Sequence, residues 1–276
     1  MRVLLTGAFG GVGTTVRERL DHEFTYLDRE APADPDAPTT VADIADYEAI
    51  RPAFDGQDAV VHLAAIPGEA PWPDILETNI VGTYNVVEAA RDAGVEAVVF
   101  ASSNSVVGAH EAEHAPALYE RGYPVVLDAD SAVRPSSRYG TAKAFGEHLG
   151  RYYVERRRAP EQFYAVRIGS HRVDPYDHPY GDAERGVAAG EFERGSPEYR
   201  RQVARLKTTW HSQRDLAHMV ECCLQDDSVG FGVFYGVSDN RDRWMDIEAA
   251  RARVGYDPAD DGGEWDGPPD DGTPAE

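Results

Sequence analysis

The chain has 276 residues, and 42% of them are hydrophobic, which suffices for one large α/β domain with a smaller appended region. Its 49 acidic residues outnumber its 27 basic ones and give a formal net charge of −22. A surface this acidic repels nucleic acids and anionic membranes, so we expect neither as a partner.

The acidic residues are spread over the whole chain rather than gathered in one tail. This distribution favours a salt-adapted protein, in which counterions screen the repulsion; a chance acidic composition is the alternative. Cys222 and Cys223 are adjacent and show neither a disulfide framework nor metal-ligand spacing, which predicts a reducing cytoplasm and no metal site. We expect no signal peptide, and no apolar run approaches the roughly 20 residues of a membrane helix.

The first predicted strand, residues 3–5, leads into a glycine-rich turn and then into a helix over residues 11–20. A dinucleotide-binding turn requires this context, because its glycines let backbone N–H groups approach a pyrophosphate and the helix N-terminus favours the negative charge. A glycine cluster alone also arises by chance. We expect the turn to hold the cofactor through Gly7, Phe9, Gly10, Gly11, Val12 and Gly13.

The second predicted strand, residues 24–27, ends at Asp28. A carboxylate about 20 residues after the glycine turn accepts hydrogen bonds from the adenosine ribose, which favours NAD. Arg29 offers a guanidinium to a 2′-phosphate, so NADP stays open as the cofactor. An ordinary loop aspartate is the alternative interpretation of Asp28.

The next elements complete the expected cofactor site. Asp43 and Ile44 are expected near the adenine, and Leu63, Ala64 and Ala65 end a strand where small residues leave room for the cofactor. His62 is a candidate ligand or acid, although a structural histidine is favoured at a strand end. The pattern of this region predicts a loop over 31–38, a helix over 47–54, a strand over 59–63 and a long helix over 74–92.

A predicted strand over residues 97–100 is followed by a serine-rich turn at the edge where parallel strands end, and a serine hydroxyl there suits a substrate oxygen. A helix over 139–153 then begins with Tyr139-x-x-x-Lys143, and this spacing places both side chains on one face. A nearby ammonium lowers the pKa of a phenol, so Tyr139 is a candidate general base. A surface Tyr–Lys pair is the alternative, but Lys143 and Lys207 are the only lysines in an arginine-rich chain.

Residues 163–168 predict a further strand, so strands alternate with helices and the sheet is parallel with right-handed crossovers. We therefore expect an α/β fold, a doubly wound Rossmann sheet with a small C-terminal substrate-binding region. The Rossmann core is assigned to residues 1–170. The substrate-binding region, together with a helix over 212–225 and a strand over 231–235, is assigned to 171–256. Residues 171–206 show no clear period, and we expect most of the acidic tail 257–276 to be disordered.

Taken together, the motifs resemble those of the extended short-chain dehydrogenase/reductase family over roughly residues 1 to 255. The resemblance implies NAD or NADP as the cofactor, with further contacts from Asn79, Ile168, Tyr139 and Lys143. The motifs that carry it are Thr6-Gly7-x-x-Gly10-x-x-Gly13, Asp28, His62-Leu63-Ala64-Ala65, Asn79, Ser102-Ser103 and Tyr139-x-x-x-Lys143.

A narrower likeness, over residues 100–104, 166–170 and Thr209-Trp210 followed by Asp215, is to the uronate dehydrogenases. The same segments are similar to haloarchaeal dehydrogenases for glucose 6-phosphate or L-arabinose. This likeness implies that Ser103 is the catalytic serine, that Asn104 and Tyr139 contact the substrate, that Ser170 lines the sugar pocket and that Arg205 holds a carboxylate. The segment 171–204 and the loop before Tyr139 are longer than in uronate dehydrogenases.

The resemblance implies an NAD(P)-dependent sugar 1-dehydrogenase that oxidises a cyclic aldose such as L-arabinose or galactose. A hexuronate or glucose 6-phosphate is the alternative substrate, and a nucleotide-sugar epimerase or dehydratase is the alternative enzyme. A non-enzymatic NAD-sensing module is disfavoured by the intact Ser103, Tyr139 and Lys143. We also expect a homodimer or homotetramer, paired through helices over 74–92 and 138–157.

Overall fold

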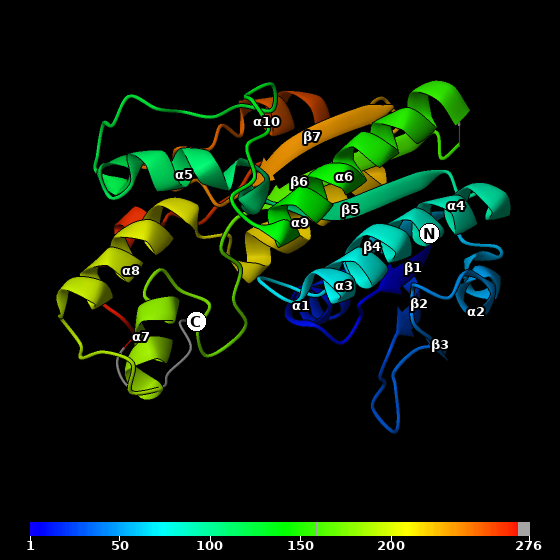
Figure 1. Cartoon of the computed structure of the whole chain (residues 1–276), viewed down its shortest axis with the longest axis horizontal. Coiled ribbons are helices and arrows are strands. Elements are labelled where there is room, and N and C mark those ends of the chain that lie inside the picture. Colours follow the sequence, from blue (N-terminus) through cyan, green and yellow to red (C-terminus); the bar gives the residue numbers. More distant parts are fainter. Residues whose placement is uncertain (158, 270–276) are drawn as a thin grey trace.

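The computed structural model describes residues 1–157 and 159–269, and Figure 1 shows its layered arrangement. In this part of the chain seven strands form one parallel sheet, in the order β3-β2-β1-β4-β5-β6-β7. The predicted α/β Rossmann fold is therefore confirmed. The strands are β1 Arg2–Thr6, β2 Glu23–Asp28, β3 Thr39–Val41, β4 Ala59–His62, β5 Ala97–Ser103, β6 Gln162–Ile168 and β7 Phe231–Gly236.

Helices cover both faces of the sheet, and two separate apolar clusters fill the layers between. Because the central strands are buried on both faces, they read as continuous apolar runs rather than alternating ones. One face carries α1 Gly11–Arg19, α9 Gln213–Gln225 and α10 Glu248–Val254. The other carries α2 Tyr47–Ile50, the 3₁₀ turn η1 Arg51–Phe54, α3 Trp72–Asp74, the π-helical η2 Ile75–Gly82, α4 Thr83–Ala93, α6 Arg138–Tyr152 and the π-helical η5 Tyr153–Arg157.

The register of the sheet brings the functional turns to one edge. Thr6 pairs with Leu27 on one side and with His62 on the other, and Ser103 pairs with Ile168. The residues that follow these positions therefore leave the sheet together at its carboxyl edge, where ligands bind in open α/β folds. This edge collects the glycine turn, Asp28 and the Ser103 turn.

Three further helices lie beyond this edge, at the left of Figure 1: α5 Gly108–His114, α7 Gly181–Ala188 and α8 Pro197–Thr209. The sequence did not predict them, nor β3 and α10. For three of them the reason is local, because β3 is only three residues long and α7 and α8 are rich in charged residues. Helices α7 and α8 pack on each other through a small cluster that includes Tyr180, Ala183 and Tyr199.

The C-terminal segment differs from the expectation of disorder over residues 257–276. Residues 257–269 follow a fully buried Tyr256, and Trp265 packs against the cluster of α7 and α8. Backbone N–H groups of Ala259 and Asp260 donate to the buried carboxylate of Asp215. This stretch buries few side chains but forms many polar contacts, which composition alone does not reveal. Residues 270–276 lie outside the described residues.

The described helices include none that is long and apolar enough to cross a membrane. The described residues also hold no group of three or more His, Cys, Asp or Glu side chains arranged to bind a metal ion. The boundary proposed at residue 170 stays a prediction, since α9, α10 and β7 return to the Rossmann sheet after it.

Candidate active site

The glycine turn between β1 and α1 packs so tightly against neighbouring backbone that two of its glycines have no room for a side chain. Gly7 has a φ of +69°, and a Cβ there would lie 2.6 Å from the backbone nitrogen of Ala64. A Cβ on Gly13 would lie 2.4 Å from the carbonyl oxygen of Gly7. The turn therefore presents bare backbone to the cleft, as close approach of a pyrophosphate requires.

The cleft beside this turn consists of two adjoining hollows that share Gly7, Gly10, Leu63 and Ala65. The first, of about 150 Å³, includes Leu27, Asp28, Arg29, Ala42, Ile44, Ala64 and Thr78. The second, of about 310 Å³, adds the glycine turn, Pro67, Ala101, Ser102, Ser103, Tyr139, Lys143, Ile168, Gly169, His171 and Arg172. An elongated ligand with an adenosine end and a reactive end fits this layout.

Asp28 lies at the adenosine end of the cleft. Its carboxylate accepts hydrogen bonds from the backbone N–H groups of Phe9, at 3.0 Å, and Arg29, at 2.7 Å. These two bonds fix the carboxylate at the mouth of the smaller hollow, where the Arg29 side chain is exposed. Asp28 and Arg29, the two residues that the sequence predicts to determine the preference for NAD or NADP, thus border the same hollow.

Three of the predicted cofactor residues lie outside the lining of both hollows. The ring of Phe9 packs on Tyr26, so only its backbone takes part in the turn. Asp43 is exposed and accepts a hydrogen bond from the N–H of Ala45. Asn79 is buried and hydrogen-bonds both backbone groups of Ile66, which holds the loop after β4 in place. Their direct contact with a cofactor stays a prediction.

The reactive end of the cleft brings Ser103, Tyr139 and Lys143 together. Ser103 ends β5, and its hydroxyl accepts from the N–H of Ser105 at 3.1 Å. Tyr139 and Lys143 lie on the first turns of α6, which begins after the Ser137 cap. The Lys143 Nζ lies 5.6 Å from the centre of the Tyr139 ring and 4.8 Å from that of Phe100.

The electrostatics of this end differ from the simple expectation of an acidic phenol. Burial raises the pKa of Tyr139, and its hydrogen bond with Ser103 lowers that pKa by less. Burial also lowers the pKa of Lys143 to about 7, because the described chain offers its ammonium no counter-charge. In the chain alone, desolvation therefore acts against ionisation of Tyr139 and outweighs its hydrogen bond with Ser103.

His62 is a structural histidine, as the sequence favoured. One ring nitrogen lies 2.8 Å from the Thr6 hydroxyl, and the other lies 3.3 Å from the Thr83 hydroxyl. Burial lowers the pKa of His62 to about 3, so the ring is neutral. With both nitrogens occupied, it ties β4 to β1 and α4 rather than serving as an acid.

The predicted sugar residues Asn104, Ser170 and Arg205 lie outside the lining of both hollows of the cleft. Asn104 is buried, and its side-chain Nδ2 has no hydrogen-bond partner among the described residues. An unpaired buried donor calls for a partner, and Asn104 directly follows Ser103. Ser170 and Arg205 are joined by a 3.2 Å bond from Nη1 to the serine hydroxyl. Ser170 and Arg205, which the sequence assigned to the same sugar site, are therefore in contact although they lie 35 positions apart in the chain.

Arg205 has a partner that the sequence did not indicate. Its Nε and Nη2 donate to the two carboxylate oxygens of Glu111 on α5, at 2.6 and 3.2 Å. Tyr119 also donates to Glu111, at 2.8 Å. These residues border a third hollow of about 620 Å³, which is lined by Gly108, Glu111, Ala112, Ala115, Pro116, Tyr119, Ser136, Arg201, Gln202 and Arg205. The two segments that are long relative to uronate dehydrogenases, which carry α5 and α8, form its walls.

Arg172 and His171 were also missed, although they follow β6 at the edge where a ligand-facing residue is expected. Arg172 forms two hydrogen bonds with the carboxylate of Asp182 on α7, at 2.5 and 2.6 Å, while lining the reactive end of the cleft. His171 hydrogen-bonds Thr15 of α1 at 3.1 Å. The segment after β6 thus covers the glycine turn.

Comparisons with known proteins agree with this geometry. The family model of the NAD dependent epimerase/dehydratase family matches residues 3–175. The chain is 39% identical to the NAD-dependent glucose-6-phosphate dehydrogenase of Haloferax volcanii, over 95% of both chains. It is 32% identical to the L-arabinose 1-dehydrogenase (NAD(P)(+)) of the same organism, over 94% of this chain and 96% of the relative.

A solved structure of a uronate dehydrogenase mutant from Agrobacterium tumefaciens, complexed with NAD, superposes with a TM-score of 0.73. It is 30% identical and covers 95% of this chain and 86% of its own. The family match spans most of the Rossmann part, and the relatives span nearly all of the chain. The protein belongs to the NAD-dependent epimerase/dehydratase family, within the extended short-chain dehydrogenases/reductases.

Proposed function

We propose that the protein is an NAD(P)-dependent dehydrogenase that oxidises C1 of a cyclic aldose to the lactone. The observation that carries this proposal is the single hollow in which the glycine turn meets Ser103, Tyr139 and Lys143. A redox cofactor bound along the turn would place its reactive end among these three side chains. The residues fit such a cofactor, because Gly7 and Gly13 leave bare backbone where a pyrophosphate has to approach.

Bound NAD(P)⁺ supplies the acceptor for the hydride that leaves C1. Tyr139 takes the proton of the anomeric hydroxyl, so that C1 becomes the carbonyl carbon of a lactone, which water then opens. Ser103 and the free Nδ2 of Asn104 hold the anomeric oxygen. Lys143 would hold ribose hydroxyls and, through its positive charge, stabilise the Tyr139 phenolate that takes the proton.

Asp28 is proposed to set a preference for NAD. The Asp28→Asn variant keeps an acceptor for the Phe9 N–H but loses the charge that repels a 2′-phosphate. The ratio of kcat/KM for NAD to that for NADP should fall by about tenfold or more, because a hydrogen bond to a charged group contributes about 1.5–3 kcal/mol. Steady-state kinetics with both cofactors measure it. Asp21→Asn, at an exposed residue before β2 and outside the cleft, should leave the ratio unchanged.

A neutral sugar fits the Arg205 side of the site better than an anion does. Glu111 already neutralises Arg205 through two hydrogen bonds, and a carboxylate or phosphate placed there would face the Glu111 charge. The paired acceptor and donor groups match the hydroxyls of a sugar. We therefore propose an aldose such as L-arabinose or galactose as the substrate class.

Glucose 6-phosphate is the second candidate. It is favoured by the 39% identity to the Haloferax volcanii enzyme and by the size of the hollow beyond Arg205, where Arg201 also lies. A hexuronate is less favoured, because Arg205 is not free to bind its carboxylate. A nucleotide-sugar epimerase or dehydratase would regenerate its cofactor, so net accumulation of NADH separates that class from a dehydrogenase.

A panel of aldoses, hexuronates and sugar phosphates with NAD and NADP, followed by absorbance of the reduced cofactor, tests the proposal. We expect turnover of neutral aldoses. The Glu111→Gln variant should shift the preference toward anionic sugars by about tenfold, because removal of one charge frees Arg205. Failure of every sugar to reduce the cofactor would contradict the proposed function. Turnover of sugar phosphates alone would replace the neutral aldose by the second candidate.

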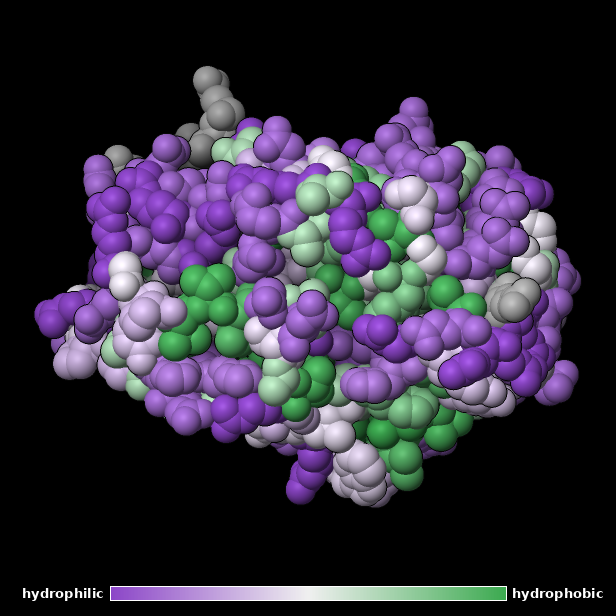
Figure 2. Space-filling view, turned by 90° about the horizontal axis from the view of Figure 1, so that it is seen from above, coloured by the Kyte–Doolittle hydropathy of each residue, from purple (hydrophilic) through white to green (hydrophobic). Residues whose placement is uncertain are grey.

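The acidic surface is proposed to reflect adaptation to salt. Hydrophilic residues cover most of the face in Figure 2, with apolar residues in smaller patches between them. Because the net charge of −22 repels itself in the folded chain, the melting temperature should fall when KCl is lowered from multimolar to low concentration. Thermal unfolding at each concentration measures this, with sucrose as a control that does not screen charge. An unchanged melting temperature would refute it.

Oligomerisation and compartment are further proposals. Leu76, Val81, Tyr84 and Tyr152 are exposed apolar or aromatic side chains on the helices expected to pair. We propose that this face forms a homodimer or homotetramer, which light scattering of the purified protein would test. The free Cys222 and Cys223 support a reducing cytoplasm as the compartment.

A further inference from the structure

The C-terminal segment 257–265 is attached to the start of α9. Both carboxylate oxygens of the buried Asp215 accept its backbone N–H groups, from Ala259 at 2.9 Å and Asp260 at 3.0 Å. The Asp260 carboxylate in turn accepts from Ser212, at 2.5 Å, and from Arg214, at 2.6 Å. Five hydrogen bonds thus hold this short, polar stretch against the protein, since Arg214 donates to Asp260 through both Nε and Nη2.

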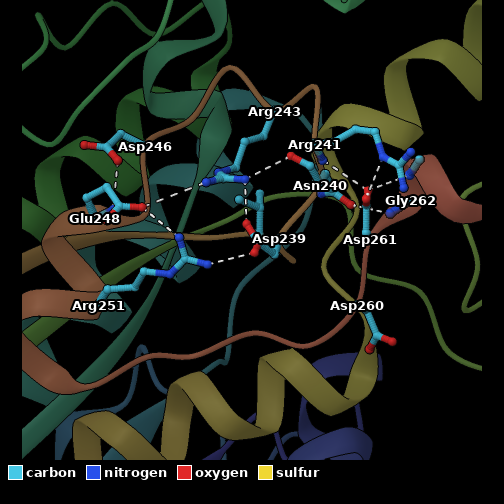
Figure 3. A network of polar contacts seen from close by, with 12 residues as sticks. Asp239, Asn240, Arg241, Arg243, Asp246, Glu248, Arg251, Asp260, Asp261 and Gly262 are labelled. Carbon is cyan, nitrogen blue, oxygen red and sulfur yellow. Dashed lines mark hydrogen bonds and ion pairs between the residues drawn. The ribbon is translucent and has the colours of Figure 1, made fainter.

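A second set of contacts fixes the middle of the segment, and Figure 3 shows it from close by. The Asp261 carboxylate accepts from the backbone and side chain of Arg241, and the N–H of Gly262 donates to the buried Asn240 at 2.8 Å. Asn240 links Gly262 to Trp210, because its Nδ2 donates to the carbonyl of Trp210 at 2.8 Å. A Cβ on Gly262 would lie 2.9 Å from the carbonyl oxygen of Lys207, so the segment runs directly against α8.

The end of the segment packs on the substrate side through Trp265. Its ring stacks on His178 with centres 5.6 Å apart and meets Trp210 edge-on at 6.2 Å. Its carbonyl oxygen accepts from Lys207 Nζ at 2.6 Å. Lys207 is one of only two lysines in the chain and lies on α8, two residues after Arg205.

The contacts of Trp210 lead directly to the predicted sugar residues. The backbone carbonyl of Thr209, its neighbour in sequence, accepts the Ser170 N–H at 2.7 Å, and the hydroxyls of Thr209 and Ser170 lie 2.8 Å apart. Ser170 in turn accepts from Arg205. Trp265, Trp210, Thr209, Ser170 and Arg205 therefore form one continuous chain of packed and hydrogen-bonded groups.

We infer that Trp265 and the segment 257–265 are positioning elements of the substrate site, which hold α8 so that Arg205 and Ser170 face the sugar. The inference rests on the proposed function for its kinetic consequence. The side-chain hydrogen bonds of the segment 257–265 reach none of the residues that line the cofactor cleft. We therefore expect the segment to affect sugar binding and not cofactor binding. Trp265 is thus a positioning residue, distinct from the groups that touch the reacting atoms.

The Trp265→Ala variant tests this directly in the full chain. We expect the KM for the sugar to rise by about tenfold while kcat changes by less than about twofold, because a distant binding contact is lost in ground and transition state alike. The Kd for NAD, measured by calorimetry, should stay unchanged and shows that the variant is folded. Trp265→Phe should restore most of the sugar affinity, since it keeps an aromatic ring against His178 and Trp210. Asp266→Asn, at an exposed neighbour outside the segment 257–265, is the matched control.

Hydrogen exchange of the same variant gives a measurement that does not depend on activity. In Trp265→Ala, amides of α8 should exchange faster, while those of α1 and α6 stay as protected as in the parent protein. A chain that ends at residue 269 should behave as the full chain does, and one that ends at residue 261 should behave as Trp265→Ala does. Unchanged α8 exchange, or loss of NAD binding in parallel with sugar binding, would overturn the inference. If the parent protein oxidises no sugar but α8 still loosens, the proposed function fails while the positioning of α8 stands.

Discussion

Replacing Tyr139 with phenylalanine is expected to lower kcat by at least about a hundredfold, the usual contribution of a general base or acid. The Tyr139 oxygen, ionised to the phenolate, is the group in the reactive hollow that is placed to take the proton of the anomeric hydroxyl, beside Ser103 and Lys143. Phenylalanine keeps the ring and its packing but has no proton acceptor. Steady-state turnover, with reduced cofactor as the readout, measures the loss.

The control for this variant separates chemistry from binding. The Kd for NAD should change little in Tyr139→Phe, because the glycine turn and Asp28 hold the adenosine and pyrophosphate end. Tyr152→Phe, at an exposed tyrosine on the same helix, should retain normal turnover. If Tyr139→Phe turned over as the parent protein does, the assignment of the general base would be wrong.

The Gly13→Ala variant is expected to lose both stability and cofactor binding. Its new Cβ would lie 2.4 Å from the Gly7 carbonyl oxygen and 2.5 Å from that of Ala8, and both are backbone atoms that cannot rotate away. Overpacking of this kind costs about 1–3 kcal/mol and displaces the turn that receives the pyrophosphate. Thermal unfolding and calorimetric titration with NAD measure the two effects.

Gly267→Ala is the matched control, because a Cβ there meets no atom within 4 Å. It should leave the melting temperature and the NAD affinity as they are. A Gly13→Ala protein with the parent stability and the parent Kd would show that the turn is not shaped for close approach of a ligand.

The Rossmann part of the fold was predictable because its signals are local. Buried parallel strands such as 59–62 and 97–103 read as short apolar runs, and the glycine turn stands between β1 and α1. The positions of Asp28, Ser103 and Tyr139 in one cleft then follow from the parallel register, because strand ends meet at one edge. For these elements, the residues near each position in the sequence are enough to predict the local structure.

The substrate side was less predictable because its contacts join distant segments. Glu111 and Arg205 lie 94 residues apart, and nothing in either segment marks the pair. Helices α7 and α8 bury little apolar surface against the sheet, so their periodicity is hidden among charged residues. The tail was expected to be disordered from its Asp, Gly and Pro content, yet Asp260 and Gly262 are held by polar partners elsewhere in the chain.

The pKa of Lys143 is a third property that the sequence does not predict. The i, i+4 spacing correctly places Lys143 on the Tyr139 face of α6, but spacing does not report burial. Burial lowers the pKa of Lys143 to about 7 and raises that of Tyr139. The i, i+4 spacing alone therefore does not predict an acidic phenol.

Oxidation of an aldose that carries deuterium at C1 tests the central claim most directly. If Tyr139 takes the hydroxyl proton while C1 gives up its hydride, the deuterium should appear in the reduced nicotinamide, with one reduced cofactor for each lactone formed. Mass spectrometry of the cofactor and of the sugar product measures both. Deuterium retained in the sugar, or consumption of the sugar without reduced cofactor, would contradict the account.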